Sequence, residues 1–310
     1  MINRTLIRIK IVQILYAYYL NGVRNVEAAK MELMFSLAKA HDLYCHMLML
    51  IVDVTRYADE QINDQETLHK VAHKEIEISH RFIDNLFVKQ LNANTALTAF
   101  ADEKKYSWMD DREYLKTLYA AITESDFYAE YMAKPQVTYD DDRELWRKIY
   151  KNIIMKDEEI TNLLEDKSLY WNDDRQIVDT FVLKTIKRFE EQNGADQEIM
   201  PEFRDEEDRE FAVKLITRAI ENDDYYQNLI SQSSRKWDFC RIAYMDLIIM
   251  QIALAEILTF PEIPVSVSIN EFVEMARCYS TSKSPSYVNG ILDGIAKRLK
   301  ADNKLLKQYK

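Results

Sequence analysis

Hydrophobic residues recur at intervals of three and four along most of the chain, which is the spacing of one buried helix face. The first such stripe consists of Ile7, Ile11, Ile14, Leu15 and Tyr18. Gly22 follows it and favours a helix end, and Asn25 is a residue type that caps the next helix. The pattern therefore predicts a first helix that ends near Gly22.

The same spacing predicts a chain that is helical almost throughout. Further helices are expected over 26–60, 66–91, 111–132, 142–165, 174–192, 206–231, 236–258, 268–279 and 285–300, with 92–110 partly loop. Ser268 and Glu271 fit a capping box, and Ser284-Pro285 places proline in a first helical turn. Only 4 glycines and 5 prolines occur in 310 residues, which disfavours strands joined by tight turns. The predicted class is all-α.

Two of the four glycines, Gly290 and Gly294, lie four residues apart inside the last predicted helix. Glycine inside a helix costs about 1 kcal/mol relative to alanine. We therefore expect another backbone to pack closely against this face.

Composition limits the class of protein. A hydrophobic content of 47% over 310 residues is enough for a sizeable core and argues against general disorder. No apolar run reaches the roughly 18 residues of a membrane span. Three distant cysteines without a CxxC motif, and a first segment that does not look like a signal peptide, favour a cytoplasmic protein.

Charge is distributed unevenly. The net charge is −11, but residues 1–26 carry +4 and residues 295–310 carry +5, which leaves −20 between them. Arg4 and Arg8 share a helix face because they are four residues apart. Basic side chains beside tyrosines are typical of surfaces that bind single-stranded RNA, although solvated helix faces and core tyrosines explain the pattern as well.

The charge pattern suggests three parts. Residues 1–60 contain the basic first helix, 61–204 form an acidic helical region, and 205–310 end in a basic tail. A weak internal repeat is suggested by the triplet Asp-Arg-Glu, which is centred on Arg112, Arg143 and Arg209.

Motifs of catalysis do not occur. The chain has no GxGxxG, GxxxxGK[ST], HExxH or GxSxG, so we predict that it is not an enzyme and has no cofactor. His69, His73, Glu77 and His80 have helical spacing, but no cysteine or second carboxylate motif completes a metal site. We expect no metal there.

One family resemblance emerges from the C-terminal third. Its residues are Ile263-Pro264, Ile269-Asn-Glu271, Glu274, Ala276-Arg277 and Tyr287-Val-Asn-Gly-Ile-Leu-Asp293. In this order they resemble the NusB transcription antitermination family. The segments Arg8–Tyr16 and Phe211–Ile216 resemble two further helices of that family. The resemblance implies an all-α bundle of NusB type, with additional helices inserted between the first helix and the C-terminal half.

The resemblance also implies a function. Members of the family are non-catalytic proteins that pair with NusE, a small-subunit ribosomal protein. They bind boxA-like single-stranded RNA and support elongation by RNA polymerase on ribosomal RNA operons; homodimers occur as well. The predicted RNA-binding residues are Arg4, Arg8, Lys10, Tyr16, Lys283, Ser286, Tyr287 and Asn289. The predicted partner-binding residues are Tyr16 and Glu256.

Some positions differ from the family. Thr5, Leu6 and Ile7 stand where basic residues are usual, and Ser286 stands where lysine is frequent, so a weaker RNA affinity is expected. An alternative function is a helical scaffold that has lost RNA binding and docks a basic partner on its acidic middle. An RNA methyltransferase is disfavoured because no glycine-rich cofactor loop follows.

Overall fold

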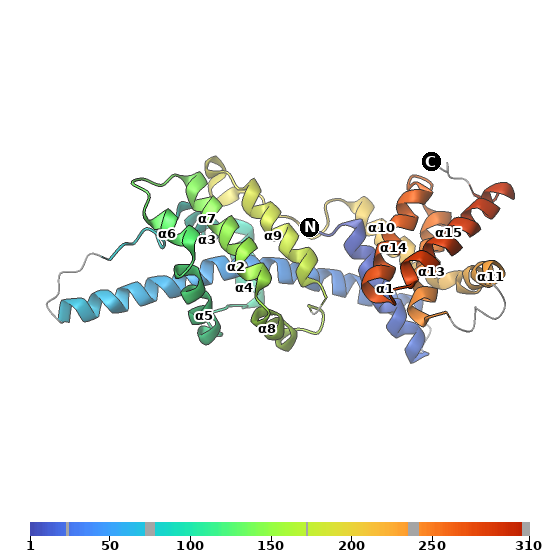
Figure 1. Ribbon diagram of the computed structural model, residues 1–310, viewed down its shortest axis with the longest axis horizontal. Coiled ribbons are helices and arrows are strands. Elements are labelled where there is room, and N and C mark those ends of the chain that lie inside the picture. Colours follow the sequence, from blue (N-terminus) through green and yellow to red (C-terminus); the bar gives the residue numbers. More distant parts are fainter. Residues whose placement is uncertain (23–24, 72–77, 172, 235–241, 306–310) are drawn as a thin grey trace. The chain divides into compact units, whose positions relative to one another are not determined.

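The computed structural model describes residues 1–22, 25–71, 78–171, 173–234 and 242–305. Within these ranges the regular elements are helices, and the one extended pairing is a parallel bridge between Ile2 and Phe203, which confirms the all-α prediction (Figure 1). None of the described helices is both long and apolar enough to cross a membrane.

The chain divides into two compact units. The first contains Met1 and Ala38–Glu202, and the second contains Ile2–Leu37 and Phe203–Lys310. The second unit therefore combines the opening helix with the C-terminal third, although about 165 residues separate these segments in sequence.

Helix α13 forms the centre of the second unit. Its side chains from Ile248 to Ile257 are buried all around the helix, and α1, α10, α11, α14 and α15 all pack against it. The helices of this unit are α1 (Arg4–Asn21), the start of α2 (Val26–Val71), α10 (Glu206–Glu221), α11 (Asp223–Ser233), α13 (Tyr244–Thr259), α14 (Val265–Tyr279) and α15 (Ser284–Ala301).

Caps at the first two helices agree with the sequence. The Asn3 side chain accepts a hydrogen bond from the Leu6 N–H at 2.8 Å, which begins α1. Gly22 ends α1 with φ of 68°, a left-handed conformation that glycine adopts without strain. Asn25 accepts from the Ala28 N–H at 3.1 Å and so caps α2 as predicted.

The first unit packs around three tryptophans. Trp108, Trp146 and Trp171 are fully buried, and the indole N–H of Trp108 donates to the His46 carbonyl at 2.8 Å. The helices of this unit are the rest of α2, α3 (Leu86–Asn92), α4 (Thr95–Lys104), α5 (Arg112–Thr123), α6 (Asp126–Met132), α7 (Tyr139–Asn152), α8 (Glu159–Lys167) and α9 (Arg175–Arg188), with 3₁₀ turns η1 (Ile154–Lys156) and η2 (Glu191–Asp196).

Helix boundaries in the first unit differ from the predicted ones. Helix α2 continues to Val71 instead of ending near 60, and α3 starts only after Asn85, whose side chain accepts from the Val88 N–H. The helix predicted over 111–132 is two helices, because Ser125 ends one and caps the next. Local caps thus override a continuous apolar period.

The predicted capping box at Ser268 and Glu271 is wrong. Helix α14 already begins at Val265, after Pro264, so Ser268 lies inside the helix, where it is fully buried. Its hydroxyl donates to Glu256 at 2.7 Å. The start of the helix predicted over 236–258 lies outside the described residues, which resume at 242.

Candidate nucleic-acid interface

A buried ion-pair network ties α1 to α13 and α14. Arg8 donates to both carboxylate oxygens of Glu256, at 2.7 and 3.0 Å, and to Glu271 at 3.1 Å. Ser268 donates to Glu256 and Thr5 donates to Glu271. Arg8 is 4% exposed and Glu256 is fully buried. The fork of the guanidinium matches the carboxylate in the bidentate geometry that makes such pairs strong.

This network gives two of the predicted binding residues a structural role. The described hydrogen bonds of Arg8 all go to protein carboxylates, so its charge is neutralised inside the unit. Glu256 lies among the same groups and not on the surface. Neither side chain is placed where an RNA phosphate or a partner protein reaches it in this structure.

The other two cations of α1 that the structure describes are paired or buried: Arg4 is 25% exposed at its side chain and forms ion pairs, and Lys10 is buried. Arg4 pairs with Glu207 at 2.5 Å and with Asp208 at 3.3 Å, and its guanidinium lies over the Phe211 ring. Lys10 is 2% exposed. The acidic first turn of α10 thus compensates much of the charge that the sequence assigned to a basic patch on α1.

The start of α15 presents the other predicted residues. Lys283, Ser286 and Asn289 are exposed, while Tyr287 is half-buried. Lys283 forms no ion pair with any described residue, and the first turn of α15 contains no acidic side chain. A helix N-terminus carries a partial positive charge. The Lys283 side chain and the dipole of α15 therefore both attract anions to the start of this helix.

The first turn of α13 brings α1 and α15 to the same end of the unit. Tyr244 packs edge-on against Tyr16 of α1, with ring centroids 5.8 Å apart. Two residues later, Asp246 accepts a 2.7 Å hydrogen bond from Ser284 at the start of α15. Tyr16 is 36% exposed and Tyr244 is 40% exposed. The first turn of α13 thus contacts both an exposed tyrosine of α1 and the residue that follows the exposed Lys283.

Sequence reasoning missed Tyr244 and the fastening role of Ser284. Ser284 is buried and accepts from the Thr281 N–H at 3.2 Å while it donates to Asp246. The sequence shows that Ser284 precedes a proline at a helix start. It does not show the hydrogen-bond partner Asp246, which lies 38 residues earlier. Only the packing of α13 against α15 shows that this serine holds the loop before Lys283 in place.

The predicted close approach at Gly290 and Gly294 is wrong. A Cβ built on either residue meets nothing within 4 Å, and both glycines lie on the exposed side of α15. Neither has positive φ. The helix tolerates these glycines because no residue packs over them. Gly290 and Gly294 therefore leave an exposed part of the α15 surface without side chains, next to Asn289.

Alanine should therefore stabilise the protein at both positions. We expect Gly290→Ala and Gly294→Ala each to raise the free energy of unfolding by about 0.5–1 kcal/mol, because alanine lowers the entropy of the unfolded chain. Urea denaturation followed by circular dichroism measures the change. A loss of stability in either variant would show that the added methyl group meets a neighbour.

The histidines considered as metal ligands are not assembled in the part of the structure that is described. His73 and Glu77 lie outside the described residues, and His80 contacts Glu66 at 2.6 Å. Groups of metal-binding side chains are not found among the described residues.

Comparison with known proteins points to one family. The model of the NusB family matches residues 180–297. The chain is 43% identical over 89 residues to the transcription antitermination protein NusB of Caldicellulosiruptor saccharolyticus, covering 29% of this chain and 68% of the relative. It is 36% identical over 124 residues to NusB of Thermodesulfovibrio yellowstonii, covering 40% of this chain and 78% of the relative.

The relatives are shorter than this chain and are not matched over their full length. The match to NusB of Finegoldia magna is 43% identical and spans 66% of that protein, so the chain spans about two thirds of several relatives it matches. A solved structure titled T. maritima NusB aligns with 51% of this chain and 95% of its own, at 26% identity and a TM-score of 0.31.

Proposed function

Because the chain belongs to the NusB family, we propose that it is an RNA-binding transcription antitermination factor that holds boxA-like RNA together with a NusE partner. The observation that carries this proposal is that the first turn of α13 contacts both Tyr16 and Ser284, the residue after Lys283. In this proposal the factor acts on the elongation complex of RNA polymerase, and ribosomal RNA operons are its targets.

In this proposal, the residues at the start of α15 bind the phosphates of the RNA. Lys283 is exposed, and the first turn of α15 itself contains no acidic side chain. The carboxylate of Asp246 lies at this helix end, but it is buried and accepts from Ser284. Ser286 and Asn289 follow at spacings of three and add exposed hydroxyl and amide groups on neighbouring turns. These groups support contact with the backbone and base edges of a single strand.

In this proposal, a base of the RNA stacks on the Tyr16 ring. Its ring is exposed and held by Tyr244, which fixes one aromatic face without burying it. Stacking of a base on such a ring contributes about 1–3 kcal/mol in single-strand binders. The proposal thus assigns RNA binding to Tyr16, Lys283, Ser286, Tyr287 and Asn289. The earlier candidates Arg8 and Lys10 are buried, and Arg4 is paired with Glu207 and Asp208, so they are left out of this surface.

Removing Tyr16 and Lys283 should weaken RNA binding in different ways. We expect Tyr16→Ala to raise the Kd for boxA-like RNA about tenfold or more, because stacking is lost. Lys283→Gln should lower the slope of log affinity against log salt by about 0.7, because one phosphate contact is lost. Fluorescence anisotropy with labelled RNA, with and without NusE, measures both effects.

Two matched variants control this experiment. Tyr16→Phe keeps the ring and should bind RNA like the wild type. Lys297→Gln removes a charge from the same helix α15, but from a lysine that already pairs with Asp293 at 2.6 Å, and it should leave the salt slope unchanged. Wild-type affinity in both Tyr16→Ala and Lys283→Gln would remove the proposed surface.

A second function is favoured by the pairing of the α1 arginines with protein carboxylates. Because Arg4 and Arg8 pair with protein carboxylates, the unit is able to serve as a helical scaffold for NusE or another basic protein without RNA. Binding of NusE with no RNA binding at low salt would support this function over the first. RNA binding that depends on Tyr16 and Lys283 would exclude it.

A further inference from the structure

Three cations form one face at the end of α9, in the unit that contains Ala38–Glu202. Lys184, Lys187 and Arg188 are spaced by three and four residues, so they lie on the same side of the helix. All three are exposed. They stand out because the long middle part of the chain is strongly acidic overall.

These cations have no carboxylate partners among the described residues, a property that they share with Lys105, Lys151 and Lys156 of the same unit. Lys184 lies over the Phe181 ring, with its nitrogen 5.4 Å from the centroid, and none of the three forms a described ion pair. In contrast, Lys89 pairs with Asp84, Arg112 with Glu60 and Lys116 with Glu113.

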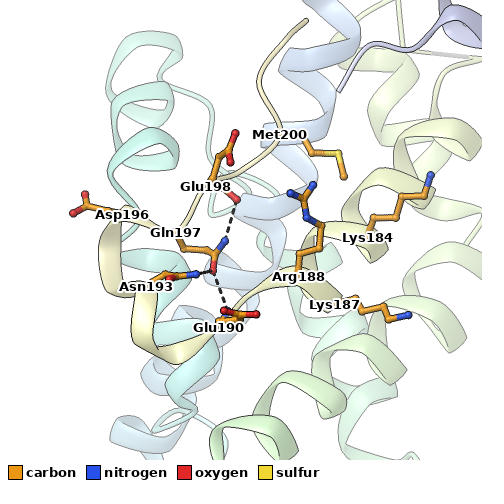
Figure 2. A pocket seen from close by; sticks show the side chains of 9 residues that line it. All are labelled: Lys184, Lys187, Arg188, Glu190, Asn193, Asp196, Gln197, Glu198 and Met200. Atoms are coloured by element: carbon orange, nitrogen blue, oxygen red, sulfur yellow. Dashed lines mark hydrogen bonds between the residues drawn. The ribbon is translucent and has the colours of Figure 1, made fainter. Parts of the chain in front are cut away.

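The cationic face borders a hollow of about 890 Å³. Figure 2 shows Lys184, Lys187 and Arg188 on one side and the segment from Glu190 to Glu198 on the other. This volume lies within the range of sites that hold nucleotide-sized ligands. Asn193 and Gln197 contribute amide groups to the lining, and Met200 contributes an apolar side chain.

The opposite wall is held in shape by hydrogen bonds. The Gln197 side chain accepts from the Glu190 N–H at 3.0 Å and from the Asn193 amide at 2.8 Å. Asn94 donates to the Gln197 carbonyl at 2.7 Å. The wall is therefore formed before any ligand arrives, which lowers the cost of binding.

Three carboxylates line this hollow, and two of them are engaged elsewhere while Glu198 is exposed. Asp196 points away from the cations (Figure 2) and accepts from Thr95 at 3.2 Å, while Glu190 accepts from Gln192 at 2.8 Å. None lies within ion-pair distance of the three cations. Positive charge is thus available along α9.

We propose that Lys184, Lys187 and Arg188 form a second RNA contact, which binds the phosphate groups of single-stranded RNA without regard to sequence. Lysine and arginine at spacings of one helical turn suit successive phosphates of a flexible strand. Cations in a last helical turn also interact favourably with the helix dipole, but that effect does not explain why the three side chains border a hollow. The proposal deepens the RNA-binding function proposed above and adds a site that the α15 surface does not include.

The test compares two triple variants of the full chain with equal changes in charge. The first is Lys184→Gln, Lys187→Gln and Arg188→Gln; the second is Lys89→Gln, Arg112→Gln and Lys116→Gln, which removes three paired cations from the same unit. The probe is oligouridine of about 20 nucleotides. The first variant should lower the log–log salt slope by about 2, because three phosphate contacts at about 0.7 each are lost.

A second readout locates the RNA directly. Oligouridine should protect Lys184 and Lys187 from acetylation, measured by mass spectrometry, while Lys116 stays reactive. Equal slopes in the two triple variants, absence of oligouridine binding by the wild type at low salt, or acetylation of Lys184 and Lys187 that RNA does not change would each overturn the proposal.

Failure of this site is distinguishable from failure of the α15 surface. If Lys283→Gln changes the binding of short boxA-like RNA and the α9 variant leaves oligouridine binding unchanged, the α9 contact alone is excluded. If the α9 variant loses oligouridine binding while Tyr16→Ala and Lys283→Gln have no effect on boxA-like RNA, the α9 contact stands and the proposed α15 surface does not.

Discussion

Replacing Arg8 with methionine should lower the free energy of unfolding of its unit by about 3–5 kcal/mol, because the change removes the bidentate, positively charged donor of a buried carboxylate. Glu256 is fully buried, and both of its oxygens accept from Arg8. Methionine has a similar length and fills much of the same space, so the loss reports the charge and not a cavity. Hydrogen exchange of peptides from α1 and α13, measured by mass spectrometry, follows this unit alone.

A compensating variant separates the ion pair from its surroundings. Arg8→Met combined with Glu256→Leu and Ser268→Ala removes the guanidinium, the carboxylate and the hydroxyl that donates to it. Glu271 is 32% exposed at its side chain and is able to turn to water. We expect most of the lost stability to return, because well-packed apolar groups replace buried ion pairs at little cost. A triple variant as unstable as Arg8→Met would show that packing, not charge, is responsible.

The same triple variant tests the sequence-based role of Arg8 in RNA binding. If Arg8 acts only by holding α1 against α13 and α14, the refolded triple variant should bind boxA-like RNA like the wild type. An affinity loss that persists after stability is restored would mean that the Arg8 charge contacts RNA.

The buried position of Arg8 follows from the spacing of the apolar residues around it, which a count of charges does not take into account. Arg8 precedes Ile11 by three residues, Val12 by four and Leu15 by seven, so it lies on the buried stripe of α1. Its partner leaves a signal as well, since Glu256 is the one acid in an apolar run on α13, from Leu247 to Leu258. A lone acid in such a run requires a buried partner. Which cation supplies it depends on tertiary packing between residues about 250 positions apart.

Local signals predicted the fold better where a cap or a turn residue determines the backbone. Gly22, Asn25 and the Ser284-Pro285 pair mark helix ends that the structure reproduces. The glycines of α15 misled because a helix glycine has two explanations, close packing or an uncovered face, and sequence does not distinguish them. The middle region was predicted to be helical, but its caps at Asn85 and Ser125 were concealed within continuous apolar periods.

A second large effect concerns pH and resides in the other unit. His46 is 1% exposed and lies between two tryptophans, with ring centroids 4.4 Å from Trp108 and 5.5 Å from Trp171. Neither ring nitrogen has a described hydrogen-bond partner. Burial lowers the pKa of His46 to about 3, and Lys167 contributes in the same direction. The imidazole is therefore neutral in the folded protein at neutral pH.

Acid should destabilise this unit through His46. In the unfolded chain a histidine has a pKa of about 6.5, so between pH 6.5 and 3 the unfolded state binds the proton that the folded state excludes. Stability is therefore complete above pH 6.5 and falls as the pH decreases, by about 2 kcal/mol at pH 5 from this residue alone. Burial raises the pKa of Asp53, so that carboxyl acts in the opposite direction.

Comparison with His46→Phe isolates the histidine, because Asp53 is present in both proteins. Phenylalanine keeps a ring between Trp108 and Trp171 and removes the two unpaired nitrogens. Urea unfolding followed by tryptophan fluorescence should give a stability difference between the variant and the wild type that is constant above pH 7. At pH 5 the difference should shift by about 2 kcal/mol in favour of the variant, since only the wild type must bury an imidazole that water would protonate. Parallel pH dependences of the two proteins between pH 7 and 5 would mean that His46 gains a proton without leaving the stack.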